Sequence, residues 1–308
     1  MPDIVISEFM DEAVIAQAFA GRDVLYDAKL VDRPEALAAA LRGARALLVR
    51  NRTQVNAALL AQAPQLRVVG RLGVGLDNID LPACKARAVQ VFPATGANDV
   101  AVAEYVITAM LLLLRRAWFA SDAVIAGQWP RMSLIGREVQ GKQLGLLGLG
   151  AIARETAQRA RALGMSIAAY DPHLPATHPA WQGTERVELD RLFADSDVIS
   201  LHVPLTPETR RIVSAARLAL MRKDAILINA ARGGIVDEAA LATALREQRI
   251  GGAALDVFET EPLDAAAGKL FATVPNLILT PHIAGVTTES NVRVSAVTAR
   301  VVLAALDA

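Results

Sequence analysis

The chain has 308 residues, of which 53% are hydrophobic and 21% charged, so it is long enough to form two domains with sizeable cores. Its 32 basic residues balance its 32 acidic residues, which gives no support for a nucleic-acid or membrane-surface partner. A single cysteine excludes an internal disulfide framework, and the four histidines show no Cys/His clustering of the kind that holds a metal. We therefore expect a cytoplasmic protein without a signal peptide, a membrane span or a bound metal.

Short strands and helices alternate along the first hundred residues. We expect strands at Ile4–Ile6, Ala46–Val49, Leu66–Val69 and Val89–Phe92, separated by helices at Glu12–Ala20, Gln54–Ala63 and Leu81–Ala88. This alternation predicts a parallel sheet, because a crossover helix returns the chain so that the next strand runs in the same direction. The first part of the chain is therefore expected to be an α/β domain.

A second alternating series follows a long apolar segment. We expect that segment, Val100–Ile125, to form one helix after the capping pair Asn98-Asp99. Beyond it the pattern predicts strands at Leu144–Leu147, Ser166–Tyr170, Val198–Leu201, Ala225–Ile228, Gly252–Leu255 and Leu277–Leu279, with helices at Ile152–Leu163 and Thr288–Leu306. The second series predicts another α/β domain.

A glycine motif marks the first strand of the second series. The pattern Gly148-Leu-Gly150-Ala-Ile-Ala153 follows a strand and opens a helix, as in sites that bind the pyrophosphate of a dinucleotide. We expect Gly148 to form the tight turn and Gly150 to let the backbone approach the phosphates. Ala151 and Ile152, at the helix N-terminus, would face the phosphates.

An acid stands where this motif requires one. Asp171 follows the next strand, about 20 residues after the glycines, where a carboxylate binds the ribose hydroxyls and repels a 2′-phosphate. The sequence therefore predicts NAD rather than NADP as the cofactor. The alternative is a glycine turn and a surface aspartate that bind nothing.

Three late strands each end in a polar segment. These segments read Asn229-Ala-Ala-Arg232-Gly-Gly, Asp256-Val-Phe-Glu259-Thr-Glu261-Pro and Thr280-Pro-His282-Ile-Ala-Gly285. In an open α/β sheet, ligands bind at the carboxyl ends of the strands. Arg232 could hold a carboxylate through its bidentate fork, and His282 could move a proton near neutral pH. An acid beside His282 would favour its charged form, and the residues alone leave Glu259 and Glu261 both open.

Together these motifs resemble the NAD-dependent D-2-hydroxyacid dehydrogenases, in the branch of D-3-phosphoglycerate dehydrogenase. Further matches, in the same order along the chain, are Gly73-Val-Gly75-Leu-Asp77, Asn98 with Val102-Ala-Glu104, and Ser200-Leu-His202-Val-Pro204. The resemblance implies catalysis by Arg232, Glu261 and His282. It also implies that Asp256 holds the nicotinamide amide, that His202 borders the cofactor, and that Ala230, Ala231 and Gly285 belong to the cofactor site.

The resemblance also implies an architecture of two Rossmann-like, doubly wound parallel-sheet domains with a cleft between them. The substrate-binding domain would combine residues 1–97 with 285–308, and the NAD-binding domain, residues 98–284, would be inserted between them. Val74 and Gly75 would offer backbone N–H groups to the substrate carboxylate, and Asn98 would lie beside the substrate. A homodimer formed through the inserted domain is expected.

Arg50 is the best indication of the substrate. In phosphoglycerate dehydrogenases the arginine at this position helps to bind the 3-phosphate, so an anionic group at C3 is expected. Two candidates are 3-phosphoglycerate and 3-sulfolactate, and the first ten residues resemble those of sulfolactate dehydrogenases in this family. If Arg50 and Arg52 are instead surface charges, a hydroxypyruvate or glyoxylate reductase is favoured. A non-catalytic NAD(H)-sensing protein is a further alternative, because such relatives carry the same three residues.

Overall fold

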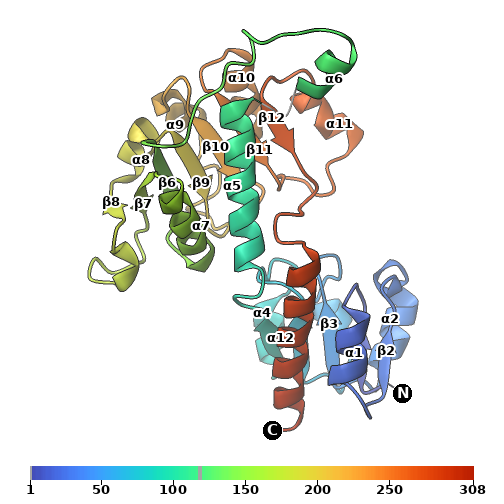
Figure 1. Cartoon of the computed structure of the whole chain (residues 1–308). Coiled ribbons are helices and arrows are strands. Elements are labelled where there is room, and N and C mark those ends of the chain that lie inside the picture. The colour runs from blue at the N-terminus through green and yellow to red at the C-terminus, as the bar shows by residue number, and fades with distance from the viewer. Residues whose placement is uncertain (1, 117–119) are drawn as a thin grey trace. The chain divides into compact units, whose positions relative to one another are not determined.

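The structure, a computed structural model, describes residues 2–116 and 120–308. The chain folds into two compact units: unit 1 comprises Met1–Asn98 with Val286–Ala308, and unit 2 comprises Asp99–Gly285. Each unit has a parallel sheet with helices on both faces (Figure 1). The expected α/β class with two doubly wound sheets is confirmed.

Unit 1 is built on a five-stranded sheet in the order β2-β1-β3-β4-β5. Apolar side chains of α1 and α12 pack on one face, and those of α2, α3 and α4 on the other. The strand order reverses between β1 and β3, which lie side by side in the sheet. The elements are β1 (Ile4–Ile6), α1 (Glu12–Ala18), β2 (Val24–Tyr26), α2 (Pro34–Leu41), β3 (Ala46–Val49), α3 (Ala57–Ala61), β4 (Val68–Arg71), α4 (Leu81–Ala86), β5 (Gln90–Pro93) and α12 (Thr288–Leu306).

The C-terminal helix α12 is fixed tightly in unit 1. Its N-terminus is a capping box, in which Ser290 N–H donates to the Thr287 hydroxyl at 3.0 Å and Thr287 N–H donates to the Ser290 hydroxyl at 2.8 Å. On β4, a Cβ added at Gly70 would lie 2.6 Å from Val302 and 2.7 Å from Thr298, so only glycine permits this close packing. Residues 286–308 are therefore an integral part of unit 1.

Unit 2 is built on a seven-stranded sheet in the order β12-β11-β10-β9-β6-β7-β8. Helices α5 and α7 pack on one face, and α8, α9 and α10 on the other. The strand order reverses between β6 and β9. The elements are α5 (Asp99–Arg115), α6 (Ala120–Ile125), β6 (Gln143–Leu147), α7 (Ala151–Ala162), β7 (Ser166–Tyr170), β8 (Glu185–Arg186), α8 (Leu189–Asp195), β9 (Val198–Leu201), α9 (Ala215–Leu220), β10 (Ile226–Asn229), α10 (Glu238–Arg246), β11 (Gly252–Leu255), α11 (Ala265–Gly268) and β12 (Leu277–Leu279).

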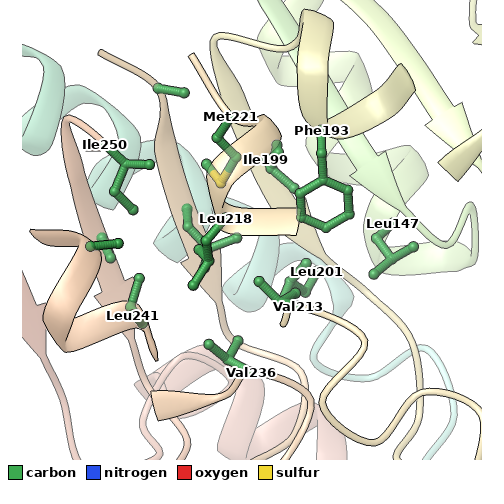
Figure 2. Packing of buried hydrophobic residues seen from close by; sticks show 14 of the residues in the cluster. Leu147, Phe193, Ile199, Leu201, Val213, Leu218, Met221, Val236, Leu241 and Ile250 are labelled. Carbon is green, nitrogen blue, oxygen red and sulfur yellow. The ribbon is translucent and has the colours of Figure 1, made fainter. Parts of the chain in front are cut away.

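The central strands of unit 2 are apolar on both faces because helices cover both sides of the sheet. Figure 2 shows one of these layers, where Ile199 and Leu201 of β9 meet Phe193 of α8 and Leu218 of α9. Each large side chain buried in this way stabilises the fold by about 1.5–3 kcal/mol. The resulting rigid sheet holds its strand ends, and the loops that follow them, in fixed positions.

Every expected strand is present, several with the predicted limits, but the predicted helix at 100–125 is wrong. Helix α5 ends at Arg115, and Arg116 has φ +51°, a left-handed conformation that cannot continue an α-helix. The rest of that segment resumes as α6, and residues 117–119 of the predicted helix lie outside the described residues. Sequence patterns also missed β2, β8 and several short helices. No helix in the described part of the chain is both long and apolar enough to cross a bilayer.

Candidate active site

The glycine turn of unit 2 lies where the strand order of its sheet reverses. Gly148 follows β6 with φ +90°, and a Cβ there would lie 2.9 Å from the carbonyl oxygen of His202, which follows β9. Only glycine fits this conformation and this close approach. Ligands of doubly wound sheets bind at such a reversal, in the crevice at the carboxyl ends of the strands.

The N-terminus of α7 is open to an anion. Its N-cap is Gly150, which makes no side-chain capping bond, and a Cβ built there would meet no atom within 4 Å. The first N–H groups of a helix lack intrahelical acceptors and carry partial positive charge, so Ala151 and Ile152 can present donors to a phosphate. Ala153 is fully buried, which lets α7 pack close to the sheet. The residues present thus fit the pyrophosphate of a dinucleotide.

Asp171 lies beside this turn at the carboxyl end of β7. Its Oδ2 accepts a hydrogen bond from Leu149 N–H at 2.9 Å, and its Oδ1 accepts one from His173 N–H at 3.0 Å. These bonds fix the carboxylate next to the glycine loop, and each oxygen keeps a lone pair for a further donor. The position suits a carboxylate that binds ribose hydroxyls. His173 and His178 are exposed, as the sequence predicts.

His202 is held in a neutral form next to Gly148. Its Nε2 lies 2.9 Å from the Ser200 hydroxyl, and desolvation lowers its pKa to about 4. A neutral imidazole adds no positive charge beside the glycine turn near neutral pH. His202 therefore contributes shape and hydrogen bonding beside the glycine turn.

Asp256, at the end of β11, organises the segment that carries His282. This carboxylate is buried, and it accepts hydrogen bonds from the Thr280 hydroxyl at 2.6 Å, from Ile283 N–H at 2.8 Å and from Ala284 N–H at 2.8 Å. Burial raises the pKa of Asp256, and these hydrogen bonds oppose that rise. The resemblance assigns Asp256 to the nicotinamide amide. In the structure its bonded groups all belong to the neighbouring 280–284 loop.

His282 and Glu261 form a pair at the ends of two neighbouring strands. Nδ1 of His282 lies 2.7 Å from Oε2 of Glu261, and the His282 N–H donates to the Asp256 carbonyl at 2.8 Å. His282 has φ +56°, a conformation that non-glycine residues seldom adopt, so the surrounding bonds hold it in place. Because Nδ1 faces the glutamate, Nε2 is the nitrogen left to exchange a proton with a ligand.

The charge of Glu261 is stabilised at this site. Burial, the largest single effect, raises its pKa, but the hydrogen bonds from His282 and Phe258 N–H and the positive charge of Arg232 outweigh it, so the pKa lies below its ordinary value. Glu259, the competing acid, points elsewhere and forms an exposed ion pair with Arg211 at 3.2 Å. The structure therefore places Glu261, not Glu259, beside His282.

Arg232 reaches this pair because of a glycine. A Cβ at Gly233 would lie 1.7 Å from the carbonyl oxygen of Phe258, so the loop after β10 packs backbone to backbone against the loop that carries Glu261. The turn is braced by Asn229, whose amide donates to the Arg232 carbonyl at 2.9 Å and whose Oδ1 accepts from Ala231 N–H at 3.1 Å. Unit 2 thus brings together a half-buried arginine, a charged glutamate and a histidine with one available nitrogen.

Unit 1 presents a second set of polar groups, where its own strand order reverses. Arg50 follows β3, is half-buried, and lies with its guanidinium carbon 5.4 Å from the centroid of the Phe9 ring. Burial lowers the pKa of Arg50, partly offset by the nearby Glu8 carboxylate. Arg52, by contrast, is exposed and paired with Asp32. The two arginines that the sequence suggested together therefore differ: one is half-buried at the reversal, and the other is a surface charge.

The remaining substrate candidates also lie in unit 1. Gly73 precedes Val74 and Gly75 and has φ +148°, and the Arg71 guanidinium occupies the space where a Gly73 side chain would be. Arg71 donates to the Leu72 carbonyl at 2.7 Å, so a second cation lies at this loop. Asn98 is partly buried, and its Oδ1 is buried with no hydrogen-bond partner.

Sequence reasoning missed two polar residues of unit 1, Glu8 and Asn291. Glu8 lies two residues after the end of β1 and is 4% exposed, and Asn291 in α12 binds Arg50. An acid just beyond a strand end was the one available signal for Glu8, but no pattern could show that it would be buried. Among the described residues, no group of histidine, cysteine and acidic side chains could hold a metal.

Comparison with known proteins decides the family. Residues 107–284 match the model described as "D-isomer specific 2-hydroxyacid dehydrogenase, NAD binding domain". The chain belongs to the D-isomer specific 2-hydroxyacid dehydrogenases. It is an NAD-dependent oxidoreductase, and the family and cofactor that the motifs predicted are confirmed.

The relatives differ in the substrates for which they are named. An (S)-sulfolactate dehydrogenase from Chromohalobacter salexigens is 53% identical, covering 97% of this chain and 96% of that protein. A D-3-phosphoglycerate dehydrogenase from Synechocystis is 42% identical, and the match covers 81% of this chain but only 45% of that protein. The chain therefore spans about half the length of this phosphoglycerate dehydrogenase.

Among solved structures, the D-lactate dehydrogenase from Aquifex aeolicus, complexed with NAD and lactic acid, is 28% identical with a TM-score of 0.88. The match covers 99% of this chain and 95% of that one.

Proposed function

We propose that this dehydrogenase acts on a small D-configured 2-hydroxy acid with an anionic group at C3, first of all 3-sulfolactate. The observation that carries the proposal is Arg50, a half-buried guanidinium with which no acidic side chain of the described residues forms an ion pair. Partial burial of a cation that has no direct ion-pair partner is costly, and an anionic ligand reduces that cost. The most similar relative named above is a sulfolactate dehydrogenase that matches nearly end to end, which supports sulfolactate over 3-phosphoglycerate.

The stereochemistry of sulfolactate is compatible with this family. Sulfur raises the priority of C3 above the carboxylate, so (S)-sulfolactate has the same spatial arrangement as a D-2-hydroxy acid. A sulfonate is also a strong acceptor for a guanidinium fork. We infer that unit 2 binds NAD and that unit 1 recognises the substrate through Arg50, Val74, Gly75 and Asn98.

Three side chains of unit 2 would perform the chemistry. NAD supplies a hydride acceptor when bound. Nε2 of His282 would take the proton of the C2 hydroxyl in the oxidation direction and return it in the reduction direction. Glu261 would keep the ring oriented through Nδ1 and stabilise the imidazolium, and Arg232 would hold the substrate carboxylate and polarise the C2 oxygen.

A panel of substrates tests the role of Arg50. With Arg50→Ala, we expect kcat/KM for 3-sulfolactate to fall about a hundredfold, because a charge-assisted bidentate contact is lost, while D-glycerate and D-lactate are little affected. Arg52→Ala is the matched control, since Arg52 already has Asp32 as its partner, and it should change none of them. An equal loss for all substrates in Arg50→Ala would contradict the anionic C3 group.

The wild type also tests the alternative activity. A preference for hydroxypyruvate would favour the reductase activity named for the Thermotoga maritima relative, which is 41% identical.

A pair of glutamate variants tests the catalytic assignment. We expect Glu261→Gln to lower kcat by about a thousandfold without weakening NADH binding, because the imidazolium loses its partner. Glu259→Gln, two residues away and outside the pair, should retain activity. His282→Ala should lose turnover and keep NADH affinity.

The sensing alternative is tested with the wild type. Complete inactivity across the substrate panel, together with tight NADH binding, would indicate a sensing protein.

We also propose a homodimer that assembles through unit 2 in the cytoplasm. Four large apolar side chains are widely exposed along one stretch of that unit, Ile125 at 84%, Trp129 at 76%, Met132 at 80% and Ile135 at 63%. Exposed apolar groups of this size mark interaction surfaces. Analytical ultracentrifugation should give twice the chain mass, and Trp129→Glu should shift it to the monomer.

A further inference from the structure

The loop that carries Arg50 is held rigidly by a buried carboxylate. Glu8 accepts hydrogen bonds from the backbone N–H groups of Arg50 at 2.8 Å, Thr53 at 3.0 Å and Arg52 at 3.1 Å. The amide of Asn78 donates to the carbonyls of Thr53 at 2.7 Å and Arg50 at 3.2 Å. The backbone from which the Arg50 side chain extends is therefore fixed on both its donor and its acceptor sides.

The far end of the Arg50 side chain has one polar partner. Nη2 donates to Oδ1 of Asn291 at 2.7 Å, and this is the only side-chain hydrogen bond of Arg50 within the described residues. Because a guanidinium has no acceptor, the atom of Asn291 that faces it must be the oxygen. The amide N–H groups of Asn291 therefore point away from Nη2 and remain available as donors.

Several donors of this hydrogen-bonded pair have no acceptor in the protein. Nε and Nη1 of Arg50 and Nδ2 of Asn291 have no acceptor among the described residues, and none of them is buried without a partner, so they are open to solvent. They come from two elements of unit 1, the end of β3 and the first turns of α12, which lie 241 residues apart in sequence. Phe9 covers one face of the guanidinium.

We propose that Asn291 is a second residue of the C3-anion subsite, holding Arg50 through its amide oxygen and donating its amide N–H groups to the same anion. The inference rests on the proposed function of Arg50. It adds α12 to the elements that recognise the substrate and makes Asn291 a specificity-determining residue.

The charge of the site suits a sulfonate. Asn291 supplies donors without adding charge, Arg50 supplies one positive charge, and Arg52 is neutralised by Asp32. The Glu8 carboxylate also lies beneath the loop. A sulfonate is a monoanion with three acceptor oxygens, whereas a phosphate monoester carries close to two negative charges at neutral pH. At the Arg50 loop, one cation with a neutral amide matches the sulfonate better.

Three variants test Asn291. We expect Asn291→Asp to raise the KM for 3-sulfolactate about a hundredfold, because the carboxylate would pair with Arg50 and repel the anion. Asn291→Ala should raise that KM about tenfold, since it removes a neutral donor and the contact that orients Arg50. The KM for D-glycerate, which has no charge at C3, should stay within about twofold of the wild type in both variants. Thermal melting of each variant shows that it is folded.

Val292→Asp is the matched control. It places the same new charge one residue along α12, at a side chain that is 42% exposed, and should leave both KM values unchanged. Equal KM increases for both substrates in Asn291→Asp, or no increase for either, would overturn the role of Asn291.

The Arg50→Ala panel separates the two proposals. If Arg50→Ala discriminates against 3-sulfolactate and Asn291→Asp does not, only the inference about Asn291 fails. If Arg50→Ala affects all substrates alike, the proposed C3-anion site fails as well.

Discussion

The two units have the same kind of topological reversal but build different sites on it. In unit 2, between β6 and β9, Gly148 and Gly150 leave an open backbone turn, and the N-cap of α7 makes no side-chain bond. In unit 1, between β1 and β3, the Glu8 carboxylate accepts hydrogen bonds from the loop after β3, and Asp11 caps α1 by accepting a hydrogen bond from Val14 N–H at 3.0 Å. An open helix N-terminus accepts a phosphate, whereas one capped by its own carboxylate repels it. Topology thus provides the location of a site, and a few residues decide its ligand.

Among the changes that test this difference between the units, the largest effect is expected from giving unit 2 the capping device of unit 1. Gly150 has φ −70°, so another residue can adopt its backbone. We expect Gly150→Asp to weaken NADH binding about a hundredfold, because the carboxylate would cap α7 and repel the pyrophosphate. Fluorescence titration with NADH measures this. Gly150→Asn caps equally well without charge and should weaken binding far less. Equal losses in both variants would show that space, not charge, distinguishes the two turns.

The second prediction concerns the buried acid of unit 1. Glu8→Gln would turn an amide N–H₂ toward backbone donors that now share two carboxylate oxygens. We expect a loss of about 2–4 kcal/mol in the free energy of unfolding, measured by urea denaturation. Glu12→Gln, an exposed acid on α1, should cost about 0.5 kcal/mol or less. Similar stabilities of the two variants would mean that Glu8 does not hold the Arg50 loop.

The third prediction uses the neutral histidine beside Gly148. The pKa of His202 is lowered to about 4 in the folded protein. As the pH falls below about 6.5, His202 therefore becomes protonated in the unfolded chain before it does so in the folded protein. The stability contributed by the neutral ring is present above about pH 6.5 and is lost, by about 3 kcal/mol at most, as the pH falls toward 4. The difference in melting temperature between wild type and His202→Gln, followed from pH 7.5 to 4, should therefore change with pH. A constant difference would contradict a neutral His202.

The smallest expected effect is at the cap of α1. Asp11→Ala removes the hydrogen bond to Val14 N–H and should cost about 1 kcal/mol of stability. Because we assign no ligand to this helix terminus, the KM values for NAD and for substrate should not change. A tighter NAD affinity in this variant would mean that the α1 terminus also takes part in cofactor binding.

Much of unit 2 could be predicted from local patterns. Strands β7, β9, β11 and β12 have the predicted limits, because fully buried parallel strands are continuous apolar runs between turn residues. The helix predicted at 100–125 failed because apolar composition alone cannot show the left-handed turn at Arg116. In the site, the positions of Arg232 and His282 at strand ends followed from the pattern. The residues alone left Glu259 and Glu261 open, and only the fold shows which one reaches the imidazole.

The sequence by itself determined the fold class, the glycine turn with Asp171, and the family, since each depends on residues within a short distance along the chain. Tertiary structure decided which charges have partners. Arg50 and Arg52 are almost adjacent in sequence, but Arg52 meets Asp32 on the surface, and Arg50 meets Asn291 of the C-terminal helix. The physical reason is that a side chain's counter-ion or hydrogen-bond partner comes from whichever element packs against it. That element can lie hundreds of residues away, where no local pattern shows it.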